Sequence, residues 1–232
     1  MYDTLHFFCK IVVYSEHMDS ILTKVLDTFF QKYTKMKYKK GEIILRAEDA
    51  PQGVFYLKKG YVRQYMVAES GTMLMLHIFK PNSFFPMMWA MNDTPNTYYY
   101  DAMTAVEIWR APKESVKEFL HEYPAVAYNL AQRLLLGIVG LQRRMEYLVM
   151  DNAYDKTLLL LIYLAQNLGE KEGEEIVLPV PVTHREISAW IGTTRETASL
   201  QVETLKKRGL IVYRKRQLTI PSLKAMQKEL GK

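Results

Sequence analysis

Residues 36–110 alternate short apolar runs with turn signals. The runs are Ile43–Leu45, Val54–Leu57, Tyr61–Val67, Met73–Phe79 and Ala102–Trp109, and the turn signals include Lys40-Gly41, Gly53, Lys59-Gly60, Ser70-Gly71 and Pro81-Asn82. Strands that recur about every 8–12 residues with such turns between them are typical of antiparallel rolls and sandwiches. We therefore predict an antiparallel β-roll in the first half of the chain.

From Pro124 to Met150 the apolar period becomes helical. Residues at one heptad position are Ala131, Ile138 and Met145, and residues at the other are Leu134, Leu141 and Leu148. Leucine at the second position favours a parallel two-stranded coiled coil, although a core-packed amphipathic helix would show a similar stripe over so short a run. We predict one long dimerisation helix, followed by a hinge at residues 150–153. Asp151 or Asn152 can cap the next helix, Asp155–Leu168.

A third pattern begins at Thr183 and predicts two short helices. Thr183-His184-Arg185-Glu186 has the form of a capping box. Gly192 breaks the first helix, and Thr193 or Thr194 can cap the second. The apolar faces of the two helices are Ile187 and Ile191, and then Ala198, Val202 and Leu205.

Two short strands follow these helices. Gly209 ends the second helix, and Leu210–Tyr213 and Gln217–Ile220 have strand-like composition. Arg214-Lys215-Arg216 lies at the turn between them. Two helices followed by a strand pair predict a winged helix-turn-helix, in which the second helix enters the major groove of DNA.

The charge distribution supports DNA binding independently. The formal net charge is +6, from 31 Lys/Arg and 25 Asp/Glu. Residues from Thr183 onward include 11 of the Lys/Arg and 4 of the Asp/Glu, so the rest of the chain has 20 Lys/Arg and 21 Asp/Glu. The basic excess is therefore confined to the end that carries the helix-turn-helix pattern, which is the field that phosphate attraction requires. A solvated basic tail is the alternative interpretation.

Composition narrows the class of protein. A chain of 232 residues is long enough for two domains, and the single Cys9 excludes an internal disulfide framework. A reduced, cytoplasmic setting fits this cysteine content. No apolar run approaches the roughly 18 residues of a membrane span, so no membrane partner is expected. His6 and Lys10 interrupt the apolar start, so no signal peptide is expected. Met18 is an alternative start of the chain.

The sequence offers no catalytic or metal-binding constellation. It has no Ser/His/Asp or Cys/His arrangement and no phosphate-binding glycine loop. The histidines lack metal-ligand spacing: His6, His17, His77, His121 and His184. We therefore expect no enzyme, no metal and no cofactor.

Together, these motifs resemble the Crp/Fnr superfamily of bacterial transcription regulators over residues 19–225. The resemblance is most specific at Arg195-Glu196-Thr197 and Leu205…Gly209-Leu210-Ile211, and extends to Gly41, Gly53, Gly60, Gly71 and Pro81-Asn82-Ser83-Phe84-Phe85. It implies an α+β fold with a cyclic-nucleotide-binding-like β-roll (19–123), a dimerisation helix (124–150) and a winged helix-turn-helix domain (151–232). It also implies a homodimer that binds an inverted-repeat operator, with RNA polymerase as a further partner.

The departures from this family concern the effector. Cyclic-AMP-binding members carry a Gly-Glu pair after Phe-Phe and an Arg-Ser/Thr pair about ten residues later; this chain has Pro86-Met87 and Asn96-Thr97 instead. A buried phosphate would be left unpaired, so cyclic nucleotide is not expected. One cysteine cannot ligate an iron–sulfur cluster, and no haem ligand lies in Phe84–Met91.

An apolar or aromatic small molecule is the effector that the remaining side chains suit. The candidate pocket comprises Met87, Trp89, Asn96, Thr97 and Tyr99, with Met88, Met91, Tyr98 and Tyr100 beside them. The alternative is that these side chains fill the roll and that no effector exists.

The resemblance and the base code assign the DNA contacts. Arg195 can donate to a guanine, and Glu196 can accept from a cytosine unless it caps the helix with Thr193. Ser199 matches a family base-reading position, and Leu200, where the family usually keeps a second arginine, can touch a thymine methyl. The expected phosphate contacts are Thr183, His184, Thr194, Thr197, Lys215 and Arg216.

Two other functions remain as alternatives. One is a ligand-binding module whose DNA-binding domain is vestigial, for which Leu200 is the best support. The other is an enzyme fused to a DNA-binding domain, which no residue constellation favours.

Overall fold

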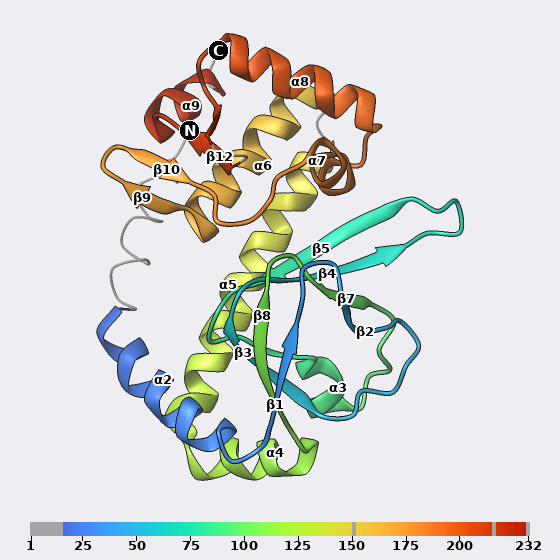
Figure 1. Cartoon of the computed structure of the whole chain (residues 1–232), viewed down its shortest axis with the longest axis vertical. Helices are drawn as coiled ribbons and strands as arrows, with labels where there is room; N and C mark the ends of the chain where they lie inside the picture. Colours follow the sequence, from blue (N-terminus) through green and yellow to red (C-terminus); the bar gives the residue numbers. More distant parts are fainter. Residues whose placement is uncertain (1–15, 150–151, 215–216, 231–232) are drawn as a thin grey trace.

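A computed structural model of the chain describes residues 16–149, 152–214 and 217–230. After helix α2 (Glu16–Phe30), two four-stranded antiparallel sheets form the front half (Figure 1). One has the order β1-β8-β3-β6 and the other β2-β7-β4-β5. The strands are β1 Thr34–Tyr38, β2 Ile43–Leu45, β3 Val54–Lys59, β4 Val62–Val67, β5 Met73–Phe79, β6 Phe84–Phe85, β7 Tyr99–Ala102 and β8 Val106–Ala111. The predicted antiparallel roll is confirmed.

The roll is closed by aromatic packing between its sheets. Phe85 of β6 stacks on Tyr100 of β7 with ring centroids 5.1 Å apart, and both side chains are buried. On the opposite face of the β1-β8-β3-β6 sheet, Phe30 of α2 stacks on Tyr56 with ring centroids 4.7 Å apart. Each stack buries a large apolar area, so the first holds the two sheets together and the second holds α2 on the roll.

The predicted strand Ala102–Trp109 is wrong. The chain leaves β7 at Ala102, turns through residues 103–105 and enters β8 at Val106. The apolar run is continuous across this turn because Met103 is itself buried. The pattern also gave no sign of β1, whose exposed side chains include Lys35 and Lys37. Helix α3 (Met87–Asn92) likewise lies where only a pocket was expected.

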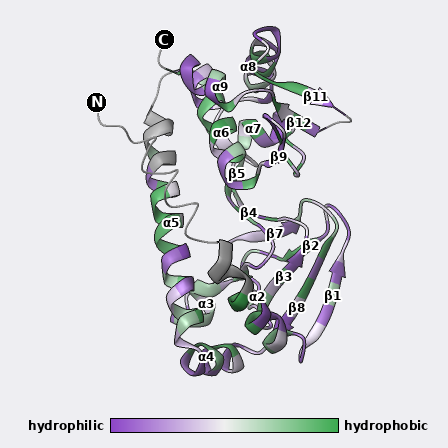
Figure 2. Cartoon of the chain, turned by 90° about the vertical axis from the view of Figure 1, so that its left-hand side faces the viewer, coloured by the Kyte–Doolittle hydropathy of each residue, from purple (hydrophilic) through white to green (hydrophobic). Residues whose placement is uncertain are grey.

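The long helix is present as α5 (Pro124–Val149), after the short helix α4 (Lys113–Glu122). It runs along one side of the molecule from the roll to the C-terminal domain (Figure 2). Its first turns pack on the roll, where Val126 is buried. Further along, several large apolar side chains are exposed: Leu134, Leu135, Leu136, Ile138, Val139, Leu141 and Met145.

The stretch Pro124–Gln142 of α5 has the length and hydropathy of a membrane-crossing helix. The expectation that no apolar run approaches the length of a membrane span is therefore wrong, as judged by length and composition alone. An apolar seam between two helices of a dimer passes the same test. Arg133 within this stretch donates to the carbonyl oxygen of Asn82 at 2.8 Å and to Ser83 Oγ at 3.0 Å. Arg133 is thus held by the roll, while the exposed apolar side chains of α5 remain available for a helix–helix seam.

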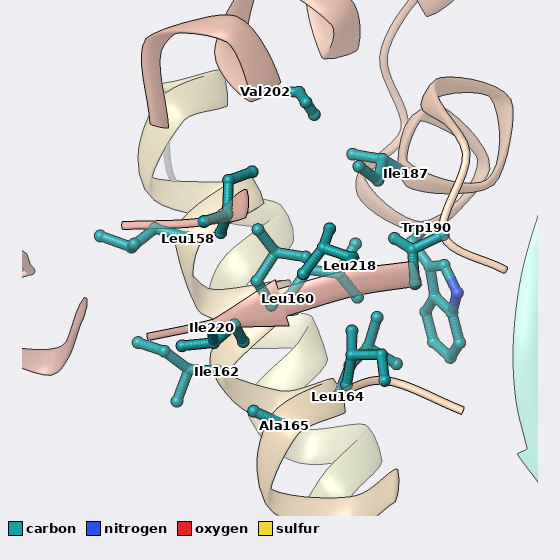
Figure 3. Packing of buried hydrophobic residues seen from close by; sticks show 14 of the residues in the cluster. Leu158, Leu160, Ile162, Leu164, Ala165, Ile187, Trp190, Val202, Leu218 and Ile220 are labelled. Carbon is teal, nitrogen blue, oxygen red and sulfur yellow. The ribbon is translucent and has the colours of Figure 1, made fainter. Parts of the chain in front are cut away.

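The C-terminal domain is a winged helix-turn-helix. Its elements are α6 Ala153–Leu168, β9 Glu170–Glu172, β10 Glu175–Val177, α7 His184–Ile191, α8 Arg195–Lys207, β11 Val212–Arg214, β12 Gln217–Ile220 and α9 Leu223–Glu229. Asn152 caps α6, because its side chain accepts from the Tyr154 N–H at 2.8 Å. The core gathers apolar side chains of α6, α7, α8 and β12, including Leu160, Ile187, Val202 and Leu218 (Figure 3).

The roll and the C-terminal domain share one hydrophobic cluster. Met75 and Ile78 of β5, together with Met103, are buried in the same cluster as the core of the C-terminal domain. Strand β5 lies directly against α7. The two domains are therefore packed on each other as well as joined through α5 and α6.

Candidate DNA-reading surface and sensor cavity

Both helices of the helix-turn-helix begin with a threonine cap. Thr183 Oγ1 accepts from the Glu186 N–H at 3.2 Å, and Glu186 Oε2 accepts from the Thr183 N–H at 2.7 Å, which confirms the predicted capping box. Thr194 Oγ1 accepts from the Thr197 N–H at 3.1 Å. Such caps satisfy backbone donors that have no partner within the helix. They fix where α7 and α8 begin.

The turn between the helices depends on Gly192. This residue adopts a φ of 67°, in the left-handed region, and its N–H donates to the Ser188 carbonyl oxygen. A side chain strains that conformation, so glycine is the residue that ends a helix most readily in this way. Helix α8 then crosses α7 with Ala198, Val202 and Leu205 fully buried beneath it.

The outer face of α8 holds the predicted base-reading residues. Arg195, Glu196 and Leu200 are exposed, and Leu200 retains 67% of its surface. Ser199 on the same face is half-buried. The alternative capping role of Glu196 with Thr193 is wrong, because the cap is Thr194 and its partner is Thr197. The Glu196 carboxylate is therefore not used at the start of the helix.

The predicted phosphate contacts fall into two groups. Thr183 and His184 lie at the start of α7, and Thr194 and Thr197 at the start of α8, where unpaired N–H groups favour anions. Lys215 and Arg216 lie outside the described residues. The neighbouring wing residue Arg214 is paired, since its Nη2 donates to Glu175 Oε1 at 2.8 Å. Tyr213 fastens the wing to the body by donating from its hydroxyl to the Val182 carbonyl oxygen at 3.1 Å.

A cavity of about 660 Å³ lies between the roll, α5 and the C-terminal domain. Met87, Trp89, Asn96 and Thr97 line it, as do Tyr98 and Tyr100. Tyr99 does not, so its assignment to the pocket is wrong. Neighbouring side chains of a strand point to opposite faces, and Tyr99 instead stacks on Tyr65 at 5.3 Å.

Sequence reasoning missed the contributions of α5, α6 and α7 to this cavity. Arg133 and Leu134 come from α5, Lys156 and Tyr163 from α6, and Trp190 from α7. These residues lie far from the roll in the sequence, so no local pattern could indicate them. Their presence means that both domains border the cavity.

The side chains at the two diagnostic positions do not fit a cyclic nucleotide. Asn96 is buried, and its Nδ2 donates to the carbonyl oxygens of Arg46 at 2.7 Å and Tyr98 at 2.9 Å. The amide therefore braces its own loop and brings no positive charge to a phosphate. Met87 offers a thioether in place of a carboxylate. Neither residue supplies the partner that a ribose or a cyclic phosphate needs.

His77 of β5 also lines the cavity and meets Phe79 edge-on at 4.6 Å. Burial, together with the positive charges of Arg133 and Lys80, lowers the pKa of His77 to about 4. The imidazole is thus neutral at pH 7. Within residues 16–149, 152–214 and 217–230, no group of three or more His, Cys, Asp or Glu side chains is arranged to hold a metal ion.

The predicted dimer residues form an exposed apolar row on α5. Leu134, Ile138, Leu141 and Met145 keep between 52% and 61% of their surface. Leu148 falls in the last turn of the helix, where the side chains lie outside the described part of the structure. Leu135 and Leu136 widen the row, so the apolar surface is broader than the heptad pattern alone predicts. A contiguous exposed apolar patch of this kind marks an interaction surface.

Two family models match the chain. The model of the cyclic nucleotide-binding domain matches residues 35–123, and that of the Crp-like helix-turn-helix domain matches residues 156–229. Among curated relatives, the "Global nitrogen regulator" of Nostoc sp. is 24% identical over 185 residues, which cover 79% of this chain and 83% of that protein. The "Transcriptional regulator SdrP" of Thermus thermophilus is 28% identical over 179 residues, which cover 76% and 84% respectively.

Solved structures show the same fold. A mutant of CooA from Carboxydothermus hydrogenoformans superposes with a TM-score of 0.70 at 23% identity, over 94% of each chain. The c-di-GMP responsive regulator CLP of Xanthomonas campestris superposes with a TM-score of 0.71 at 17% identity, over 85% of this chain and 98% of that one. At these identities the likeness concerns the fold alone.

Proposed function

We propose that this chain binds an inverted-repeat operator as a homodimer. It belongs to the Crp/Fnr superfamily and is a DNA-binding transcription regulator of that type. The observation that carries this proposal is the outer face of α8. The helix is capped, packed by its inner face and presents Arg195, Glu196 and Leu200 to solvent. The family is one of transcription regulators, which are not enzymes.

Arg195, Glu196, Ser199 and Leu200 are the proposed base-reading residues. All four lie on the first two turns of α8, the part of a recognition helix that meets base edges. Arg195 suits guanine, Glu196 suits cytosine and Leu200 suits the thymine methyl group. The family resemblance implies a second base-reading arginine where Leu200 stands, so the half-site should differ from the common one at that step.

The proposed phosphate contacts position the domain without specifying sequence. Thr183, His184, Thr194 and Thr197 surround the beginnings of two helices, whose N–H groups and dipoles attract phosphate. Lys215 and Arg216 would add two positive charges from the wing. Such contacts give salt-dependent affinity for DNA of any sequence.

The exposed row on α5 is the proposed dimer seam. Leu134, Ile138, Leu141, Met145 and Leu148 would pack against the same residues of a second chain, as in a parallel coiled coil. A two-fold dimer places its two recognition helices about 34 Å apart, one turn of DNA. The two-fold symmetry is the reason to propose an inverted repeat, and the spacing sets the distance between its half-sites. The proposed division of the chain is 19–123, 124–150 and 151–232.

The proposed effector is an apolar or aromatic small molecule, or there is none. Met87, Trp89 and Tyr100 give the cavity its apolar and aromatic lining. Arg133 and Lys156 lie at the same cavity, so an acidic group on such a molecule would have positive charge nearby. RNA polymerase is proposed as a partner and the cytoplasm as the location, both from the family.

Selection from a random DNA pool tests this proposal. The chain should enrich an inverted repeat whose two half-sites lie about one helical turn apart. Enrichment of no sequence would contradict it and would support the alternative of a ligand-binding module with a vestigial DNA-binding domain.

A further inference from the structure

Arg63 lies at the junction between the roll and the C-terminal domain. Its Nε donates to Asp101 Oδ1 at 2.7 Å and its Nη2 to Asp101 Oδ2 at 2.6 Å. Its third nitrogen, Nη1, lies 3.6 Å from Glu186 Oε1. The three side chains keep only 19%, 5% and 13% of their surface, so these charges interact largely away from water. We call Arg63, Asp101 and Glu186 the interdomain triad.

The triad ends on the helix that opens the helix-turn-helix. Glu186 uses Oε1 for Arg63 and Oε2 for the Thr183 N–H, the reciprocal bond of the capping box. The first turn of α7 is thereby tied to a residue of the roll. Helix α7 in turn packs on α8, so the orientation of the DNA-reading helix follows that of α7.

An aromatic pair supports Arg63 from within the roll. The guanidinium carbon lies 5.2 Å from the centre of the Tyr65 ring, and Tyr65 stacks on Tyr99 at 5.3 Å. In the ladder between β4 and β7, Arg63 faces Asp101 and Tyr65 faces Tyr99. A bidentate partner and a ring leave the guanidinium little freedom, so its third nitrogen is pre-oriented toward Glu186.

The residue between these pairs belongs to the cavity. Gln64 pairs with Tyr100 in the same ladder, and its Nε2 donates to the Tyr100 hydroxyl at 3.0 Å. Gln64 and Tyr100 both line the cavity. Because side chains alternate along a strand, β4 and β7 carry the cavity residues Gln64 and Tyr100 on one face, and Arg63 and Asp101 of the interdomain triad on the other.

We propose that Arg63 and Glu186 are positioning residues for DNA reading, which hold the helix-turn-helix on the roll with the outer face of α8 directed away from it. The inference rests on the proposed function. In this arrangement α8 lies at the end of the molecule remote from the roll (Figure 1), and Leu200 is 67% exposed. The docked state is thus the DNA-competent one.

Glu186→Gln separates this role from helix capping. Glutamine can still accept from the Thr183 N–H, since the capping box tolerates either residue, but it lacks the charge that attracts Arg63. Glu175→Gln is the matched control. It removes the same charge from the same domain, yet the partner of Glu175 is Arg214, which lies within that domain. Both variants remove one negative charge, and the affinity of each for random DNA corrects the comparison for any difference in attraction to phosphate, including that of Arg214.

The first test compares the two variants on the selected operator by fluorescence anisotropy. Glu186→Gln should bind about fivefold more weakly than Glu175→Gln, the lower end of typical coupling between sites. The preferred sequence should stay the same, and Glu186→Ala, which also loses the cap, should melt at a lower temperature than Glu186→Gln. Equal operator affinities of Glu186→Gln and Glu175→Gln would overturn the inference.

The second test needs no DNA. Spin labels report the distance between the domains when they are attached at the exposed positions Lys39 on the roll and Lys207 on α8. The labelled chain carries Cys9→Ser, so that only these two positions react, and it is diluted in unlabelled chain, so that only distances within one chain are measured. Glu186→Gln should broaden that distance distribution and Glu175→Gln should not. Identical distance distributions for Glu186→Gln and Glu175→Gln would overturn the inference, even where the operator is unknown. Failure of the unaltered chain to enrich any DNA would instead count against the proposed function itself.

Discussion

Replacement of Leu141 by lysine should split the proposed dimer. Leu134, Ile138, Leu141 and Met145 each keep about half of their surface in the single chain, between 52% and 61%. Burying the exposed half of such a side chain contributes about 1 kcal/mol. Four residues from each of two helices then supply about 8 kcal/mol toward association. The substitution removes part of this free energy of association.

The loss has two parts. Two leucines no longer contribute, which removes about 2 kcal/mol. Two ammonium groups are brought into an apolar seam without partners, which costs about 3 kcal/mol or more. The sum of about 5 kcal/mol raises the dissociation constant of the dimer by a factor of about 10³–10⁴.

Multi-angle light scattering at about 100 μM measures the result, because about 8 kcal/mol corresponds to a dissociation constant of about 1 μM. The unaltered chain should show twice the chain mass of 27.1 kDa, and Leu141→Lys should show 27.1 kDa. Leu141→Met is the control, because a swap that conserves volume should keep the dimer. Operator affinity should fall with the mass, since one half-site alone binds weakly. An unchanged dimer mass for Leu141→Lys would refute the seam.

The remaining predictions concern DNA contacts, pH and the effector. Arg195→Ala should cost about 1–3 kcal/mol per half-site and relax the preference at one guanine, whereas Lys215→Ala should weaken binding to all sequences and flatten the salt dependence. The pKa of His77 is lowered to about 4, so the unfolded chain binds a proton at this residue before the folded chain does as the pH falls below about 6.5. The free energy of unfolding should therefore drop by about 2 kcal/mol between pH 7 and pH 5 through this group. Urea unfolding should show that drop as the difference between the unaltered chain and His77→Gln. Cyclic AMP at millimolar concentration should change neither the melting temperature nor the operator affinity, because a ligand of the folded state stabilises it by mass action.

Each of these has an outcome that counts against it. Equal losses for Arg195→Ala and Lys215→Ala on specific and random DNA would remove Arg195 from base reading. An identical pH dependence with and without His77 would show that its neutral form is not what the fold requires. A saturable thermal shift with cyclic AMP that disappears on replacing Asn96 or Thr97 would restore a nucleotide sensor.

The helix-turn-helix could be predicted in detail from the sequence because its signals are local. A threonine cap, a glycine turn and an apolar face each lie within a few residues, so Thr183, Gly192 and Val202 indicate the same two helices. The roll was predictable in kind, but the turn at residues 103–105 was not, because buried Met103 continues the apolar run through it.

The cavity and the interdomain triad depend on contacts between distant segments. Tyr99 was placed in the pocket on composition, whereas strand alternation turns it to the opposite face. Arg63 reads as an ordinary polar position of a strand, and nothing near it in the sequence indicates that Glu186 is its partner. Positions 63 and 101 meet across the β4–β7 ladder, and position 186 joins them only where the roll and the C-terminal domain pack together.

Methylation interference on the selected operator tests the central claim most directly. Methylation at N7 blocks the major-groove edge of guanine that an arginine reads. If two copies of the chain each insert α8 into the major groove, methylation of one guanine per half-site should block binding. The two guanines should be related by two-fold symmetry and lie about one turn of DNA apart. Both signals should disappear with Arg195→Ala. Interference at a single unpaired position, or none in the major groove, would contradict the account.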